Sequence, residues 1–282
     1  MIAIRTVWGM IWRSTLVALG YITGLIVAGV IAGFLGLPVS GRQNGSVSFA
    51  WLILSGMLLG LFLGPLAARL ALARWQHFFL WASVIFFNMG AVAIEGAYFV
   101  PSLVPLPIPV LLFQQVLAAA GAALAISALF ASPGQPVSWW AALRRRPWHA
   151  WLWRFAASAL SYVVLYYVFG ALNYMLVTQP YYASHAGGLD VPSPGQVILA
   201  ELVRAPLLIL SVLLFVLSAQ MPRRRLMIVT GLLLFAIGGI VPLVIQIGSL
   251  PLLLLAASAI EILLQNSGTG LVAAWLLGIY DS

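Results

Sequence analysis

The stretch GQVILAELVRAPLLILSV, residues 195–212, places Glu201 and Arg204 three positions apart in a run that is otherwise almost wholly apolar. The apolar run that contains it, 196–219, is long enough for an α-helix to cross a hydrocarbon core, which takes roughly 20 residues. An ionised side chain at the centre of a bilayer costs at least about 2.5–3.5 kcal/mol, so it must be paired, protonated or in contact with water. The stretch therefore predicts a membrane helix that carries a polar site.

The composition of the whole chain points the same way. Hydrophobic residues fill 63% of the 282 positions, charged residues only 6%, and the mean hydropathy is +1.10, whereas an ordinary soluble domain is about 25% charged. Cysteine and lysine are absent, so no disulfide, thiolate nucleophile or cysteine metal site can form. We predict an integral membrane protein whose partner is the lipid bilayer. Its net charge of +8 fits arginines that flank helices, and no nucleic acid is expected.

Eight apolar runs have the length of membrane helices, and glycine, proline and serine clusters separate them. They lie at 14–36, 49–69, 77–99, 109–131, 152–177, 196–219, 226–247 and 252–278. The sequence therefore predicts an all-α, polytopic membrane protein with eight transmembrane helices.

The arginines predict the orientation of these helices. Eleven of the 13 flank the runs on one side, Arg42 lies on the other side, and Arg204 lies within a run. The positive-inside rule then places both termini in the cytoplasm. The first run is too long for a signal-peptide core, so we expect it to be retained. Arginine used without lysine suggests a GC-rich genome, hence the plasma (inner) membrane of a prokaryote.

The two halves of the chain resemble one another. At an offset of 141, Trp12, Arg13 and Tyr21 match Trp153, Arg154 and Tyr162, and at 147 Gly121 matches Gly268. We predict two tandem four-helix repeats, 1–136 and 137–282, in parallel orientation because each contains an even number of helices. The alternative is that two polytopic halves share Trp-Arg flanks without a common origin.

The second run carries Gly56, Gly60 and Gly64 at a spacing of four. Small residues at this spacing form a flat face on which another helix backbone can approach closely. We expect this face to pack against a helix of the same chain or of a second copy in a homo-oligomer.

Three of the five acidic residues, Glu95, Glu201 and Glu261, lie inside predicted helices. A rise of 1.5 Å per residue puts Arg204 about 12 Å and Glu261 about 14 Å into their runs, and Glu95 about 8 Å from the end of its run. All four charges then lie in the outer half of the membrane or near its midplane. With polar neighbours at helical spacing, the predicted substrate or proton site comprises Glu95, Glu201, Arg204, Glu261, Gln265, Asn88 and Gln114. The alternative is that these groups only hold helices together.

Other chemistry is sparse. No histidine lies well inside a predicted helix, and no nucleotide-binding motif is present, so no metal, cofactor or catalytic residue is predicted. The outer loop YYASHAGGLDVPSPG, residues 181–195, contains His185 and Asp190 and is either a lid over the site or a plain surface loop.

Three functional hypotheses remain open. The first is a transporter or permease for a small polar or anionic solute, with an externally open site at Arg204 and a coupling proton or cation at Glu261 and Glu95. The second is a non-catalytic subunit of a larger membrane complex. The third is an enzyme that acts on a lipid-linked substrate, with Glu95 or Glu261 as base and His185 assisting.

Overall fold

The computed structural model describes residues 2–38, 49–101 and 106–279. Eight helical segments are long and apolar enough to cross a membrane, which confirms the predicted all-helical, multi-pass architecture. Their bounds are α1 (Ile2–Phe34), α2 (Phe49–Ala67), α3 (Arg74–Phe99), α4 (Ile108–Leu129), α6 (Trp148–Asn173), α8 (Pro194–Ser218), α9 (Arg223–Phe235) with α10 (Val241–Ile245), and α11 (Leu252–Leu277). Arg42 falls outside the described residues.

The short elements connect or extend these helices. They are β1 (Ala71–Leu72), β2 (Ser132–Pro133), α5 (Trp139–Arg144), α7 (Gln179–Ala183) and a 3₁₀ turn at Ala186–Gly188. Two π-helical turns, Tyr174–Thr178 and Ala236–Ile240, join α6 to α7 and α9 to α10. The largest differences from the predicted bounds are that α1 begins at Ile2, well before the apolar run, and that the fifth segment continues as helix to Ala183.

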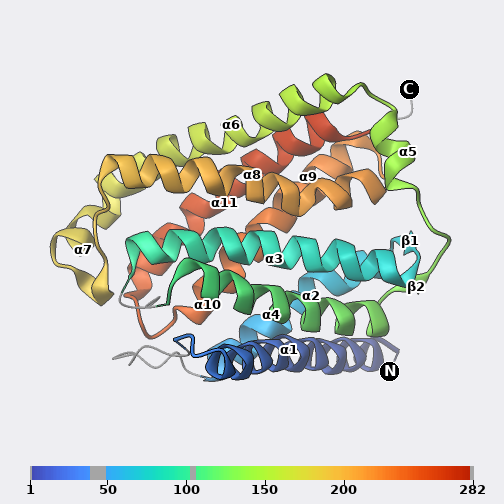
Figure 1. The fold of residues 1–282 in the computed structure, drawn as a ribbon, viewed down its shortest axis with the longest axis horizontal. Helices are drawn as coiled ribbons and strands as arrows, with labels where there is room; N and C mark the ends of the chain where they lie inside the picture. The colour runs from blue at the N-terminus through green and yellow to red at the C-terminus, as the bar shows by residue number, and fades with distance from the viewer. Residues whose placement is uncertain (1, 39–48, 102–105, 280–282) are drawn as a thin grey trace.

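The long helices lie roughly along one another, as Figure 1 shows. Both termini, α5 and the two strands are at one end, which we call the arginine-rich end, and α7 is at the opposite end, which we call the α7 end. At the arginine-rich end β1 and β2 pair in parallel. Beside them the Gln76 amide donates to the Val137 carbonyl at 2.5 Å and accepts from the Val137 N–H at 2.9 Å. These contacts fix the start of α3 against the loop that follows α4.

The helices pack in two similar groups. In the first half α4 packs against α1 and α3, and α1 packs against α2; in the second half α11 packs against α6 and α9, and α6 against α8. Contacts of α3 with α8, of α3 with the π-helical turn Ala236–Ile240 and of α2 with α10 join the halves. The residues that position the polar site therefore come from helices on both sides of this junction.

Glycine allows the closest helix contacts. In α2, Gly56 and Gly60 face Ala18 and Ser14 of α1, and Gly64 faces the Phe130 ring. The predicted flat face is thus covered by helices of the same chain. Backbones also meet at Gly20 of α1 and Gly121 of α4, since a methyl group on Gly20 would lie 2.6 Å from the Gly121 carbonyl oxygen.

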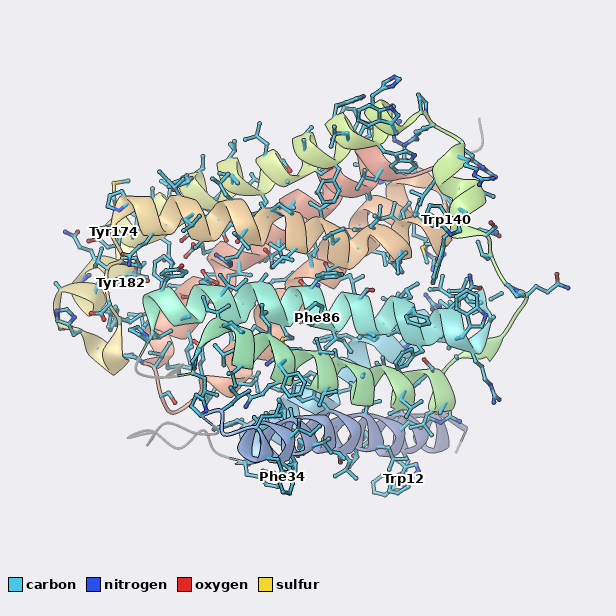
Figure 2. All side chains as sticks on the ribbon, in the orientation of Figure 1. Trp12, Phe34, Phe86, Trp140, Tyr174 and Tyr182 are labelled. Atoms are coloured by element: carbon cyan, nitrogen blue, oxygen red, sulfur yellow. The ribbon has the colours of Figure 1, made fainter. Side chains whose placement is uncertain are left out.

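Apolar and aromatic side chains cover the outside of the bundle. Trp12 and Phe34 point away from it along α1, and Trp140 lies at the arginine-rich end, whereas Tyr174 and Tyr182 lie at the α7 end (Figure 2). Trp12, Phe34 and Trp140 are each more than half exposed. An apolar exterior with aromatic residues at both ends suits a bilayer environment.

Arginines bind the end of α11. Arg146 donates to the Gly278 carbonyl at 2.6 Å and to the Leu276 carbonyl at 3.1 Å, and Arg154 also donates to Leu276 at 2.6 Å. Cationic donors satisfy the free carbonyls at a helix C-terminus and interact favourably with its dipole. Arg154, near the start of α6, therefore fastens α6 to the last turn of α11.

Candidate functional site

Arg204 joins two carboxylates from different helices. Its Nη1 donates to Glu201 Oε1 one turn earlier on α8, and its Nη2 donates to Glu95 Oε2 of α3 at 2.6 Å. Arg204 is 5% exposed and Glu201 is fully buried, while the Glu95 side chain is 33% exposed. The structure thus brings three predicted site residues together, and each terminal nitrogen of the guanidinium already holds a carboxylate.

Two tyrosines of α6 lie against the same guanidinium. Tyr162 and Tyr166 are one turn apart, and each ring centre is 5.7 Å from Arg204 Cζ. An aromatic face attracts a cation at this range. Arg204 consequently connects α3, α6 and α8.

Glu261 of α11 forms a second polar group. Asn173 Nδ2 donates to its Oε2, and Gln265 Nε2 donates to its Oε1 at 2.7 Å. Gly170 leaves room beside it, since a methyl group there would lie 3.2 Å from Oε1. Among the described residues no arginine forms an ion pair with Glu261, so amide groups alone hold its carboxylate.

Asn88 of α3 belongs to a third group. Its Nδ2 donates to the Val84 carbonyl at 2.9 Å, but its buried Oδ1 has no hydrogen-bond partner among the described residues. A methyl group on Gly238 would lie 2.9 Å from this Oδ1 and 3.0 Å from Asn266 Nδ2, which donates to the Leu234 carbonyl. Glycine therefore allows two asparagines to approach the π-helical turn.

These groups surround a cavity of about 390 Å³. Its polar wall contains four residues of the predicted site, Glu95, Arg204, Glu261 and Gln265. Asn173 and Asn266 also line this wall. Its aromatic wall contains Phe99, Tyr162, Tyr166, Tyr167, Tyr174 and Tyr182. Tyr174 and Tyr182 place one side of this cavity at the α7 end of the bundle (Figure 2).

Three predicted residues do not line the cavity. Glu201 lies behind Arg204, and Asn88 contacts the wall at Gly238. Gln114 is on α4, which packs against α1 and α3, and its neighbour Gln115 accepts a hydrogen bond from Tyr21 at 3.2 Å. The structure therefore separates Gln114 from Glu261, although the repeat alignment makes them equivalent.

Both π-helical turns border the cavity. Tyr174 and Thr178 line it from the first turn and Gly238 from the second. A proline follows each turn by two residues, Pro180 and Pro242, and cannot donate the hydrogen bond that would continue a regular helix. π-helical turns are rare and occur frequently at functional sites.

The loop residues His185 and Asp190 lie beside the cavity. His185 Nδ1 is 3.2 Å from Asp190 Oδ1, and both side chains are more than half exposed. They line a separate hollow with Tyr98 and Gln196, and Tyr182 lines both hollows. The Asp190 N–H donates to the Phe99 carbonyl at 3.0 Å, so the loop is tied to the end of α3.

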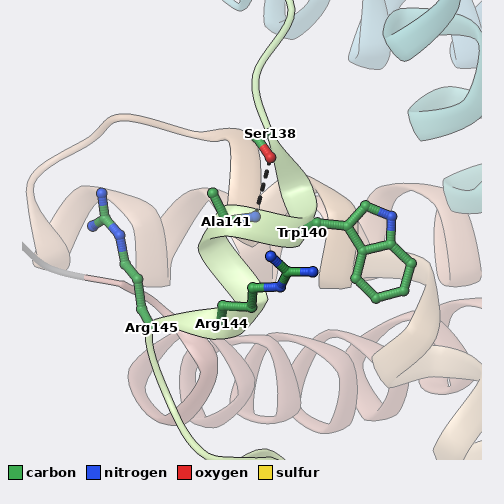
Figure 3. Close-up of a pocket in the computed structure, with 5 residues that line it drawn as sticks. All are labelled: Ser138, Trp140, Ala141, Arg144 and Arg145. Carbon is green, nitrogen blue, oxygen red and sulfur yellow. Dashed lines mark hydrogen bonds between the residues drawn. The ribbon is translucent and has the colours of Figure 1, made fainter.

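A further hollow lies at the opposite end of the molecule. Ser138 caps α5 by accepting from the Ala141 N–H at 3.1 Å, and Trp140, Arg144 and Arg145 complete the lining. Arg145 extends to the opposite side from Trp140, as Figure 3 shows. This open surface hollow lies at the arginine-rich end, away from the carboxylates.

Sequence reasoning did not place Tyr182 and Asn266 in the site. Tyr182 is in the loop segment, and its position depends on α7 folding back beside the end of α3. Asn266 directly follows Gln265 and therefore does not lie on the helical face that Glu261 and Gln265 share. The sequence signals near the cavity are Pro180 and Pro242, which follow the two π-helical turns.

No group of three or more histidine, cysteine, aspartate or glutamate side chains within the described ranges could hold a metal ion. No protein-family model, curated protein or solved structure matches this chain.

Proposed function

We propose that this protein is a multi-pass membrane transporter or permease for a small polar solute, which binds in the cavity between α3, α6, α8 and α11. The observation that carries the proposal is Glu261, a carboxylate on the wall of a 390 Å³ cavity that no arginine neutralises among the described residues. An ionisable group inside a membrane segment is costly and usually serves a pathway, a relay or a ligand.

The alternative of purely structural ties accounts for only part of the arrangement. Arg204 with Glu95 and Glu201 is a buried ion-pair network that can join helices without any cavity. Glu261 joins α11 to α6 through Asn173, yet its carboxylate faces an open volume. Room for a molecule beside an unneutralised charge is not needed for helix packing, and this favours a solute site.

The charge of the cavity bears on the type of solute. Arg204 already donates to two carboxylates, which offset its positive charge, so the anion-binding role expected from the sequence is not favoured. A polar solute that carries hydrogen-bond donors finds an acceptor, the Glu261 carboxylate, already on the cavity wall. We therefore propose a neutral or cationic solute in preference to an anionic one, with Glu261 contacting it or carrying a coupling proton.

We also propose that the two halves are tandem repeats. The helix contacts support this, because α1 meets α4 as α6 meets α11, and α3 meets α4 as α9 meets α11. The contact of α3 with α8 has its counterpart in that of α2 with α10. In this proposal the arginine-rich end, which holds both termini, faces the cytoplasm of a prokaryotic cell and the α7 end faces outward.

The test is uptake by the purified protein in liposomes. We expect faster entry of labelled choline or erythritol than into protein-free vesicles, and a loss of about tenfold or more in Glu261→Gln, which keeps the size of the side chain and removes its charge. Gln114→Leu is the matched control, since Gln114 lies outside the cavity, and it should transport as the unaltered protein does.

Flux equal to that of empty vesicles for choline, erythritol and succinate would contradict the proposal, as would full activity of Glu261→Gln at the same amount of folded protein. Absence of flux together with a fixed partner in mild detergent would instead favour the subunit hypothesis. The enzyme hypothesis is less favoured, because His185 lines the neighbouring hollow and not the cavity that contains Glu95 and Glu261.

A further inference from the structure

The cavity carries an excess of negative charge. Counted as ionised, the lining residues Glu95 and Glu261 carry negative charge and Arg204 carries positive charge, which Glu201 behind it offsets. Glu95, Arg204 and Glu261 all line this cavity, so the two polar groups act on the same space. A positive centre placed between Glu95 and Glu261 would be attracted by both.

Hydrogen-bond acceptors are also in excess. Glu261 accepts only from the neutral amides of Asn173 and Gln265. Carboxylate oxygens that are held only by neutral amides favour a ligand that brings donors or positive charge.

Aromatic rings complete this environment. Tyr166 and Tyr182 line the same cavity as Glu95 and Glu261. Tyr166 already faces Arg204, but Tyr182 and Tyr174 form a ring pair with centres 5.8 Å apart that faces no cation among the described residues. Aromatic faces near carboxylates are the means by which proteins recognise organic ammonium groups.

We infer that the solute is a small organic cation, with its ammonium group between Glu261 and Glu95 and its carbon skeleton against Tyr182 and Tyr174. This inference rests on the proposed function and names its substrate class. An inorganic ion fits less well, because the described residues offer no cluster of three acidic or histidine ligands. A volume of about 390 Å³ lies in the range of small-molecule sites, which are roughly 300–1,000 Å³.

The experiment compares ammonium ligands with neutral molecules of the same shape. The protein in lipid nanodiscs is titrated with choline and with 3,3-dimethylbutan-1-ol, and then with phenethylammonium and 2-phenylethanol, by calorimetry. We expect each ammonium to bind at least about tenfold more tightly than its neutral counterpart. Equal affinity within each pair, or binding of neither ammonium, would overturn the inference.

Variants locate the site. Glu261→Gln should weaken ammonium binding by about tenfold or more, and Tyr182→Leu by about threefold or more, whereas Tyr182→Phe keeps the ring and should lose less. Tyr98→Leu is the matched control, because Tyr98 lines only the neighbouring hollow. If Tyr98→Leu weakens binding as much as Tyr182→Leu does, the assigned site is wrong.

Binding and transport can fail separately. Choline that binds in nanodiscs but does not enter liposomes would leave the cation site standing and remove the transport function. Erythritol or succinate uptake that depends on Glu261, with no ammonium binding, would keep transport and overturn the organic cation.

Discussion

Replacement of Arg204 by methionine is expected to lower the free energy of unfolding by about 3–5 kcal/mol, because it leaves a buried carboxylate without its positive partner. Glu201 is fully buried, and one of its oxygens already lacks a hydrogen-bond partner among the described residues. The measurement is unfolding by SDS in mixed micelles, followed by tryptophan fluorescence.

The double variant Glu201→Met, Arg204→Met separates the two contributions. With both buried charges gone, most of the lost stability should return, since hydrophobic replacement of a whole buried ion pair is often neutral or stabilising. Glu95 can remain charged because its side chain is one-third exposed. Arg144→Met, at an exposed position on α5, should change stability by no more than about 0.5 kcal/mol. A double variant as unstable as Arg204→Met would contradict this account of the ion pair.

The second large effect is expected where α1 meets α4. Leucine at Gly20 would place its Cβ 2.6 Å from the Gly121 carbonyl oxygen, and a backbone atom cannot move aside as a flexible side chain can. We expect a loss of about 3 kcal/mol or more, at the upper end of overpacking effects. The same unfolding measurement applies.

Gly9→Leu is the matched control on the same helix, because no atom lies within 4 Å of a Cβ built there. It should leave stability within about 0.5 kcal/mol of the unaltered protein. If both variants are equally stable, the close backbone contact of α1 and α4 is not what holds these helices together.

Hydrophobic runs predicted the eight helices, because crossing a hydrocarbon core requires long apolar segments whatever their packing. The hydrophobic runs did not predict the residues at which the helices begin and end. α1 starts at Ile2, because Arg5 and Arg13 end the apolar run without interrupting the helix. Helix also continues through Pro180, because a π-helical turn accommodates the missing N–H.

The site was predictable to the extent that it depends on spacing within one helix. Glu201 with Arg204, and Glu261 with Gln265, are pairs at i, i+3 and i, i+4. Glu95 reaches Arg204 only because α3 packs against α8, and no spacing in the sequence contains that contact. The repeat alignment pairs Gln114 with Glu261, but equivalent positions of two repeats lie in different halves of the bundle, and Gln114 is not on the cavity wall.

The two halves differ in how closely α1 approaches α4 and α6 approaches α11. In the first half, Gly20 and Gly121 bring α1 and α4 into backbone contact. In the second half, a methyl group on Gly268, the counterpart of Gly121, would meet the Leu165 side chain at 2.8 Å, so a bulky residue separates α6 from α11 there. The cavity lies beside the separated pair.

The hydrogen bond from Arg154 to the Leu276 carbonyl would act as the pivot of a rotation of α6. It fastens α6 to α11 at the arginine-rich end, while Asn173, 19 residues further along α6, meets Glu261 at the cavity. At 1.5 Å per residue this gives a lever arm of about 28 Å, so a rotation of about 4° about Arg154 would displace Asn173 by about 2 Å. Such a rotation would widen the cavity between these helices most at the α7 end and least beside Arg154.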